Sequence, residues 1–253
     1  MAERRYKAVV IDLFDTLVTW NPEGLPLMQF RGREIRSTTP LLYPALKSAL
    51  RERFDPDKFS EAHATAYADI FAARSRHDAT EITCLERFER TLRILDIEPR
   101  VATPLAETLR KVHMSQVRKV TKAPPARIAA MKRIAKQYRV GLISNFDDSE
   151  TGHHIMRDTG IRDLFDAVII SADTGYRKPN PRIFRIILDL MKLKPADILF
   201  VGDTPVDDVL GSKQIGMHSA WIRSRGRELP EGVPAPDIII SDLAELPAAL
   251  GLP

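Results

Sequence analysis

Apolar residues follow two different patterns along this chain. Short runs that are apolar at successive positions lie near the start and again after residue 138, at residues 8–14, 140–144, 167–171, 198–202, 218–222 and 237–241. Such runs, without alternation, are typical of parallel strands that are covered on both faces. Helical spacing of apolar residues separates them, at 126–138, 150–159, 181–191 and 206–215. Strands and helices in alternation predict a doubly wound α/β domain with a parallel, Rossmann-like sheet.

The stretch from about residue 40 to residue 121 differs, because no strand-like run interrupts its helical spacing. The predicted helices cover residues 41–54, 56–76, 82–95 and 103–120. Asp55-Pro56 and Thr103-Pro104 each place a capping residue before a proline, which predicts two helix starts. Loop-like sequences flank the stretch at 21–24 and 122–125. We therefore predict an α/β core of residues 1–18 and 122–253, and an all-helical domain of residues 19–121 inserted into it.

Composition narrows the classes of partner. The chain has 253 residues and a net charge of +4, which suits a small anionic substrate but is too weak to indicate nucleic acid. Its one cysteine, Cys84, excludes an internal disulfide, so we expect a reducing compartment, the cytoplasm. The first residues lack the apolar stretch of a signal peptide, and no segment approaches the ~20 apolar residues of a membrane span. No pattern indicates the oligomeric state.

Polar residues suited to phosphate chemistry stand where three of the predicted strands end. Asp12 and Thr16 come at the end of the first run, Ser144-Asn145 end the second, and Asp203, Asp207 and Asp208 follow the run at 198–202. Lys178 lies between these groups in Lys-Pro-Asn-Pro. In an open α/β sheet, ligands bind just outside the carboxyl ends of the strands. We therefore expect these side chains to converge on one crevice.

The order of these segments resembles the haloacid dehalogenase superfamily, whose members are mostly magnesium-dependent phosphatases with a helical cap after the first motif. The resemblance implies that Asp12 is the nucleophile and that Lys178 neutralises the nucleophile and the transferred group. It also implies that Ser144, Asn145 and Thr16 bind phosphate. The implied Mg²⁺ ligands are Asp12, Asp203, Asp208 and the main-chain carbonyl of Phe14, with Asp207 left to solvent.

Phe14 departs from the phosphatase pattern. Phosphatases that this chain resembles usually carry a second aspartate two residues after the nucleophile, and that aspartate protonates the leaving oxygen. Dehalogenases of the superfamily carry an aromatic residue there, but they act without metal and typically lack the acid at the position of Asp203. Asp15 stands where the family usually has glycine, and alternation along an extended chain predicts that it points away from Asp12.

Three functions remain open. The one we favour is a magnesium-dependent phosphatase of a small phosphorylated metabolite, which works through an aspartyl-phosphate on Asp12. The alternatives are a 2-haloacid dehalogenase that forms an ester on Asp12, and a weakly active binding or regulatory protein. We expect residues of the inserted domain to select the substrate. Tyr67 and Phe71, one helical turn apart, are interpreted as part of that domain's core.

Overall fold

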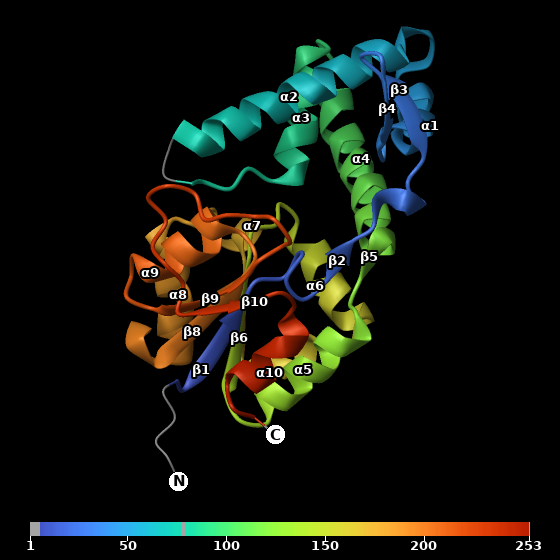
Figure 1. The fold of residues 1–253 in the computed structure, drawn as a ribbon. Coiled ribbons are helices and arrows are strands. Elements are labelled where there is room, and N and C mark those ends of the chain that lie inside the picture. Colours follow the sequence, from blue (N-terminus) through green and yellow to red (C-terminus); the bar gives the residue numbers. More distant parts are fainter. Residues whose placement is uncertain (1–5, 77–78, 253) are drawn as a thin grey trace. The chain divides into compact units, whose positions relative to one another are not determined.

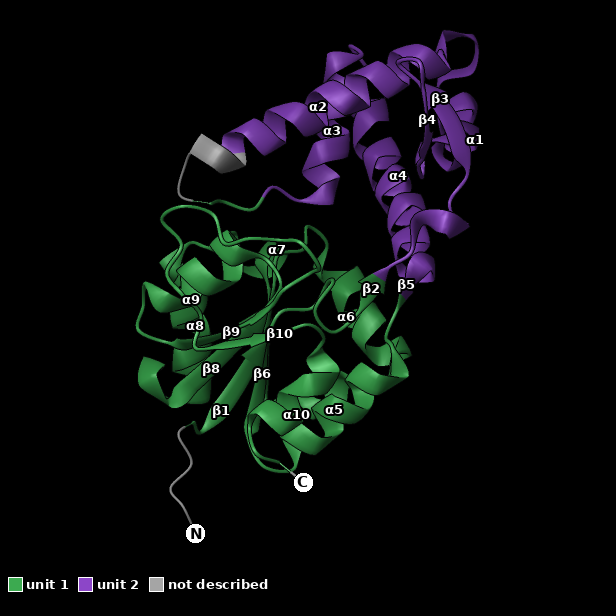
Figure 2. Ribbon diagram, viewed as in Figure 1, with its two compact units in different colours: residues 1–19, 78–81, 122–253 green, residues 20–77, 82–121 purple. Residues whose placement is uncertain are grey.

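The computed structural model describes residues 6–76 and 79–252. It divides into two compact units, coloured separately in Figure 2. The first unit contains residues 1–19, 78–81 and 122–253, and the second contains residues 20–77 and 82–121. The division lies close to the two predicted boundaries. It differs from them in one segment, because residues 79–81, from the middle of the insertion, pack with the first unit.

A parallel six-stranded sheet forms the centre of the first unit (Figure 1). Its strands are β1 (Ala8–Ile11), β6 (Arg139–Ser144), β7 (Ala167–Ile170), β8 (Ile198–Gly202), β9 (His218–Ile222) and β10 (Ile238–Ile240). The order across the sheet is β10-β9-β8-β1-β6-β7, so β1 lies between β6 and β8. All six predicted strands are present, and the prediction of a doubly wound α/β core is confirmed.

Side chains of the sheet alternate between two apolar clusters, one on each face. Val9 and Ile11 of β1 belong to one cluster, whereas Ala8 and Val10 belong to the other. The covering elements are α5 (Pro125–Ala135), α6 (Ser149–Asp158), α7 (Ser171–Thr174), α8 (Pro181–Met191), α9 (Gly211–Lys213) and α10 (Leu246–Ala249). Burial on both faces explains why these strands are apolar throughout.

Local capping sets where the longer helices of this unit begin. The side chain of Asp148 accepts a hydrogen bond from the amide of Thr151 at the start of α6, and Asn180 does the same for Arg182 at the start of α8. The predicted helix at 206–215 is instead a π-helical turn, Pro205–Leu210, followed by the short α9. Single 3₁₀ turns of this unit cover Arg162–Leu164, Pro195–Asp197 and Leu243–Glu245. Two more, Pro22–Gly24 and Arg51–Arg53, belong to the second unit.

The second unit is mainly helical. It contains α1 (Thr39–Leu50), α2 (Pro56–Arg76), α3 (Cys84–Ile94) and α4 (Pro99–Val120). The expectation of an all-helical insertion is wrong, because β3 (Leu27–Phe30) and β4 (Arg33–Arg36) form an antiparallel hairpin. Both turn residues, Arg31 and Gly32, have positive φ (49° and 74°), which suits a two-residue hairpin. The side chains of β3 and β4 are exposed or only partly buried, so no apolar run reveals these strands.

One of the two predicted helix starts is correct. The side chain of Asp55 accepts hydrogen bonds from the amides of Asp57 and Lys58, and α2 begins at Pro56. Pro104 is not a helix start, because α4 begins five residues earlier, at Pro99, and continues through it. Burial of Leu105 and Leu109 downstream compensates for the backbone hydrogen bond that Pro104 does not make.

The chain passes between the units beside a short two-stranded ladder. Its strands are β2 (Thr19–Trp20) and β5 (Thr121–Lys122). Cys84 is buried in the second unit. Among the residues that the structure describes, no helix is long and apolar enough to cross a bilayer.

Candidate active site

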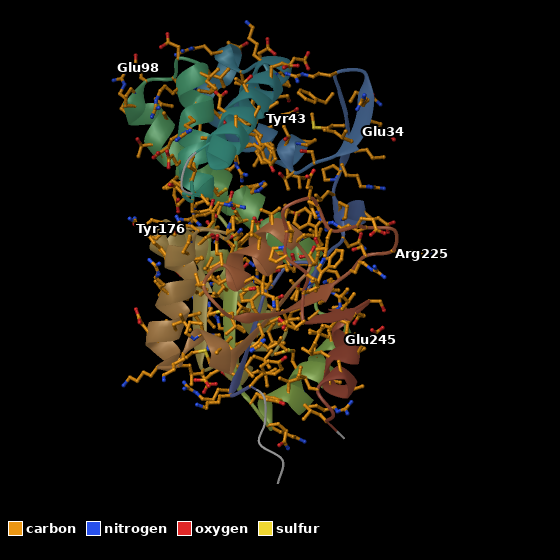
Figure 3. All side chains as sticks on the ribbon, turned by 60° about the vertical axis from the view of Figure 1, so that its left-hand side comes forward. Glu34, Tyr43, Glu98, Tyr176, Arg225 and Glu245 are labelled. Carbon is orange, nitrogen blue, oxygen red and sulfur yellow. The ribbon has the colours of Figure 1, made fainter. Side chains whose placement is uncertain are left out.

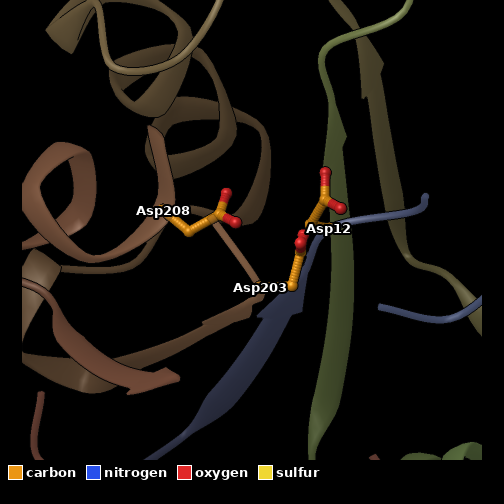
Figure 4. A group of neighbouring side chains, drawn as sticks. All are labelled: Asp12, Asp203 and Asp208. Atoms are coloured by element: carbon orange, nitrogen blue, oxygen red, sulfur yellow. The ribbon is translucent and has the colours of Figure 1, made fainter. Parts of the chain in front are cut away.

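Three carboxylates gather at the carboxyl ends of the central strands. Asp12 follows β1, Asp203 follows β8, and Asp208 lies in the turn after β8. Each offers an oxygen atom within 4.8 Å of the others, and Figure 4 shows the three side chains facing one another. They converge because β1 and β8 are hydrogen-bonded in parallel, so both strands end at the same edge of the sheet.

Lys178 lies between two of these carboxylates. Its Nζ donates to Asp12 Oδ1 and to Asp208 Oδ1, both at 2.6 Å, and its side chain is 2% exposed. The three carboxylates outnumber the one ammonium group that donates to them, so negative charge is in excess here. A divalent cation with a preference for oxygen ligands, such as Mg²⁺, matches this charge and this set of donors.

The ionisation of the site reflects its excess of negative charge. Burial raises the pKa of Asp12 to about 7, and Asp208 and Asp203 add to this rise while Lys178 opposes it. Burial likewise raises the pKa of Asp203 to about 6, with Asp208 as the next cause. Burial alone would lower the pKa of Lys178, but Asp12 and Asp208 hold it above its ordinary value. A bound cation would relieve the repulsion among the carboxylates.

Two buried hydroxyl groups belong to the loops of this site. Ser144 is the last residue of β6, and Thr16 lies in the turn after β1. Ser144 Oγ and Thr16 Oγ1 are both buried, and neither has a hydrogen-bond partner in the described part of the chain. An unpaired buried hydroxyl costs about 1–3 kcal/mol. Phosphate oxygens would supply partners for both, so these residues fit the predicted anion site.

The side chain of Asn145 contacts the protein instead of facing an open space. Its Nδ2 donates to the carbonyl of Lys178 and to Asp207 Oδ2, each at 3.0 Å, and its Oδ1 accepts from the amide of Lys178 at 2.7 Å. The amide group therefore holds the chain around Lys178. Asp207, expected to be solvated, is partly buried in this arrangement, and burial together with Asp208 raises its pKa.

Sequence reasoning missed several groups that position the acids. Trp221 Nε1 donates to the carbonyl of Asp203 at 3.0 Å, and Arg227 lies 3.7 Å from its carboxylate. The amide of Thr204 donates to Asp208 Oδ2 at 2.8 Å. A Cβ on Gly202 would lie 2.2 Å from the Asp208 carboxyl group, so only glycine allows this approach. Trp221 and Arg227 stand far downstream, on and after the neighbouring strand, where no motif marks them.

The loop after Asp12 turns sharply. The amides of Leu17 and Val18 both donate to the carbonyl of Leu13, and Asp15 adopts a left-handed backbone with φ 59°. Alternation along an extended chain therefore does not apply to Asp15, and the argument that directs its side chain away from Asp12 loses its premise. The exposed Asp15 contributes to raising the pKa of Asp203, after burial and Asp208. The negative charge of Asp15 therefore acts on Asp203 in the acidic cluster.

The second unit contains a cavity of its own, with a volume of about 530 Å³. Its lining combines the apolar side chains of Trp20, Phe30 and Tyr67 with the polar side chains of Thr38 and His63. Tyr67 is 49% exposed and Phe71 is 64% exposed, so the interpretation of both as core residues is wrong. A concave, mostly apolar lining with a few polar groups is typical of small-molecule sites.

Comparison with known proteins places the chain in one family. The model of the haloacid dehalogenase-like hydrolases matches residues 6–216. The pyrimidine 5'-nucleotidase YjjG of Escherichia coli is 30% identical over 63% of this chain and 68% of its own. The glyceraldehyde 3-phosphate phosphatase of Pyrococcus furiosus is 26% identical over 87% of this chain and 82% of its own. The 2-haloacid dehalogenase of Pseudomonas syringae shares the fold, with a TM-score of 0.68 at 23% identity over 97% of this chain and 98% of its own.

Proposed function

Because the chain belongs to the haloacid dehalogenase-like hydrolases, we propose that it is a magnesium-dependent phosphatase of a small phosphorylated metabolite. One observation carries this proposal. The carboxylates of Asp12, Asp203 and Asp208 lie together, with Lys178 donating to two of them, in a site whose loops bear the unpaired hydroxyls of Ser144 and Thr16. This arrangement suits a divalent cation and a tetrahedral anion together. Two relatives that are named for phosphate-ester substrates support it.

In this proposal Asp12 performs the chemistry. An oxygen of its carboxylate attacks phosphorus, the bond from phosphorus to the leaving oxygen breaks, and an aspartyl-phosphate forms. Water then attacks the same phosphorus and releases inorganic phosphate and the Asp12 carboxylate. Lys178 balances charge on Asp12 and on the transferred group, while the hydroxyls of Ser144 and Thr16 donate to phosphoryl oxygens.

The proposed metal ligands are Asp12, Asp203, Asp208 and the main-chain carbonyl of Phe14. When bound there, Mg²⁺ supplies positive charge against the phosphoryl oxygens. Phosphate binding by Asn145 stays a prediction, and its side chain has a second task. We assign its side chain to holding the Lys178 loop, because it hydrogen-bonds to the main chain of Lys178 and to the carboxylate of Asp207.

A second candidate is 2-haloacid dehalogenase chemistry. The aromatic Phe14 favours it. The presence of Asp203 and Asp208 argues against it, because the dehalogenases typically lack the first of these acids. A third candidate is a binding or regulatory protein with weak turnover.

A cytoplasmic location stays a prediction that depends on the single cysteine.

One panel of assays separates the three candidates. Phosphorylated metabolites and 2-haloacids are each incubated with Mg²⁺ and with chelator, and released phosphate and halide are measured. We expect phosphate release with Mg²⁺ only. Halide release in chelator would establish the dehalogenase. Saturable ligand binding without release of phosphate or halide would favour the regulatory protein.

A further inference from the structure

A short piece of the insertion lies against the loop that carries Lys178. Residues 79–81 connect α2 to α3 along the chain, yet they form backbone hydrogen bonds in the first unit. The amide of Glu81 donates to the carbonyl of Gly175 at 2.9 Å, and the amide of Arg177 donates to the carbonyl of Ala79 at 2.8 Å. Between them, Thr80 pairs with Tyr176, which Figure 3 labels. This contact ends one residue before Lys178.

The carboxylate of Glu81 is fully buried beneath this contact. Arg177 donates to both of its oxygens, at 3.1 and 3.0 Å. Ser171 Oγ donates to Glu81 Oε2 at 2.5 Å. The same Ser171 Oγ accepts a hydrogen bond from the amide of Phe146 at 2.9 Å. A charged carboxylate thus joins the segment before Lys178 to the segment after Ser144 and Asn145.

The two segments joined by Glu81 carry different parts of the proposed chemistry. Ser144 offers a hydroxyl to the transferred group, and Lys178 offers an ammonium. Asn145 already ties the two segments at one point, through the backbone of Lys178. Glu81 ties them at a second point, through Arg177 on one side and Ser171 on the other. Two separate ties restrict the rotation that one tie would still allow.

A purely stabilising role does not explain this carboxylate well. Burying a charged pair has a large desolvation cost, and replacing such a pair by well-packed hydrophobic residues is often harmless to stability. Hydrogen bonds to charged groups, in contrast, are strong and directional, so they hold their partners in one geometry. Hydrogen-bond partners that orient the ligands of a metal site typically contribute 10–100-fold in activity, and we expect the same range for a group that orients Lys178.

We propose that Glu81 is a positioning residue for catalysis, which the insertion supplies to hold Lys178 and Ser144 in register. This inference rests on the proposed phosphatase function, because that function gives Lys178 and Ser144 their tasks. Glu81 does not touch the reacting atoms. It acts through Arg177 and through Ser171.

The test compares Glu81→Gln with the unmodified full chain. We expect kcat to fall roughly 10–100-fold while KM stays within about threefold, because binding determinants remain and transition-state alignment is lost. Hydrogen exchange measured by mass spectrometry should become faster in both segments, residues 144–146 and 175–179. Unchanged kcat in a folded Glu81→Gln variant would overturn the proposal.

Two further variants separate positioning from stability. Glu81→Gln combined with Arg177→Gln removes the buried carboxylate together with its partly buried cation, so we expect stability to recover while kcat stays low. Recovery of kcat together with stability would overturn the proposal. Asp237→Asn is the matched control, because Asp237 pairs with Lys213 at the amino end of β10, away from the strand ends that bear the site. It should lower stability without changing kcat or the exchange of the two segments.

A third variant covers the case in which Glu81→Gln does not fold. Ser171→Ala cuts only the branch toward Phe146, so exchange should rise at 144–146 and stay unchanged at 175–179. If Ser171→Ala raised the exchange rate equally in both segments, the proposal would be overturned. The exchange measurements also distinguish the two levels of inference. If the unmodified protein releases no phosphate, the proposed function fails, whereas faster exchange in Glu81→Gln still shows that Glu81 orders both segments.

Discussion

The phenyl ring of Phe14 packs against that of Phe146, with ring centroids 4.8 Å apart and planes inclined by 42°. Phe14 stands two residues after Asp12, and Phe146 stands two residues after Ser144. The aromatic pair therefore bridges the loops after β1 and β6 with an apolar contact. In this chain Phe14 stands where related phosphatases usually carry an acid, and its ring forms this apolar contact instead.

The first prediction follows from this contact. Without an acid at Phe14 the leaving oxygen departs unassisted, so kcat/KM should depend steeply on the pKa of the leaving group. Aryl and acyl phosphates should react readily and alkyl phosphates slowly. A series of aryl and alkyl phosphates measures the slope. Phe14→Asp should recover part of the ~10²–10⁴-fold that a general acid supplies, most clearly for alkyl phosphates.

A flat dependence in that series, with chemistry shown to be rate-limiting, would assign the acid elsewhere. Asp15 is then the first residue to examine, because its charge acts on Asp203. Asp15→Asn would restore a steep slope in that case. In the case that we expect, it should leave the slope unchanged.

The second prediction concerns the nucleophile. Asp12→Asn keeps the shape of the side chain and removes the attacking charge, so phosphate release should fall to background. The fold should persist, because Lys178 keeps its hydrogen bond to Asp208 at 2.6 Å. Released phosphate and the thermal unfolding transition are the two measurements. Substantial turnover by a folded variant would show that another group attacks.

The third prediction concerns magnesium. Binding to the folded state alone should stabilise the protein by about 2.7 kcal/mol at a Mg²⁺ concentration of 100 Kd. Thermal unfolding with Mg²⁺ and with sodium chloride of equal ionic strength measures this effect. Asp203→Asn should abolish most of it. Asp207→Asn is the matched control, because Asp207 is the adjacent carboxylate that we do not assign as a ligand, and a similar loss there would contradict the ligand set.

The fourth prediction concerns acid stability of the second unit. Burial, reinforced by Arg87, lowers the pKa of His63 from 6.5 to about 3. The unfolded chain therefore binds more protons than the folded chain between these values, and stability falls as the pH falls through this window. His63 alone should account for up to about 2 kcal/mol between pH 7.5 and pH 5.

Urea unfolding at the two pH values tests this effect. His63→Phe keeps a ring in the stack between Phe59 and Phe88, whose centroids lie 5.8 and 5.1 Å from the imidazole. The variant should lose less stability than the unmodified protein on acidification. An equal loss in both proteins would assign the acid sensitivity to other groups, of which His113, with its pKa lowered by burial, is the next candidate.

The fifth prediction concerns substrate selection. Tyr67 lines the cavity of the second unit. Phe71, one turn further along α2, is exposed and is not among the residues that line this cavity. Tyr67→Ala should raise KM for the preferred metabolite roughly tenfold, equivalent to ~1.4 kcal/mol of lost contact. It should leave cleavage of a small aryl phosphate unchanged. Phe71→Ala should change neither value, and equal effects from both variants would argue against selection by the cavity.

The sequence alone determined the class of fold and the members of the acidic site. Buried parallel strands are apolar at every position, so β1, β6, β7, β8, β9 and β10 are all recognisable locally. Asp12 and Asp203 follow such strands directly, and Asp208 lies in the turn after the second of them. Strands that pair in parallel bring their ends together. Helical spacing likewise revealed α1, α2, α3 and α4, although Pro104 misplaced the start of α4.

The tertiary structure alone decided how these groups are held. Nothing near Glu81 in the sequence indicates that it contacts Arg177, which lies 96 residues away. The tasks of Asn145 and Trp221 depend on partners in distant loops, and the hairpin of β3 and β4 has no buried face to give an apolar pattern. Periodicity reports which side of an element is buried. It carries no information about which distant side chain completes a hydrogen bond, because that partner is selected only when the elements pack.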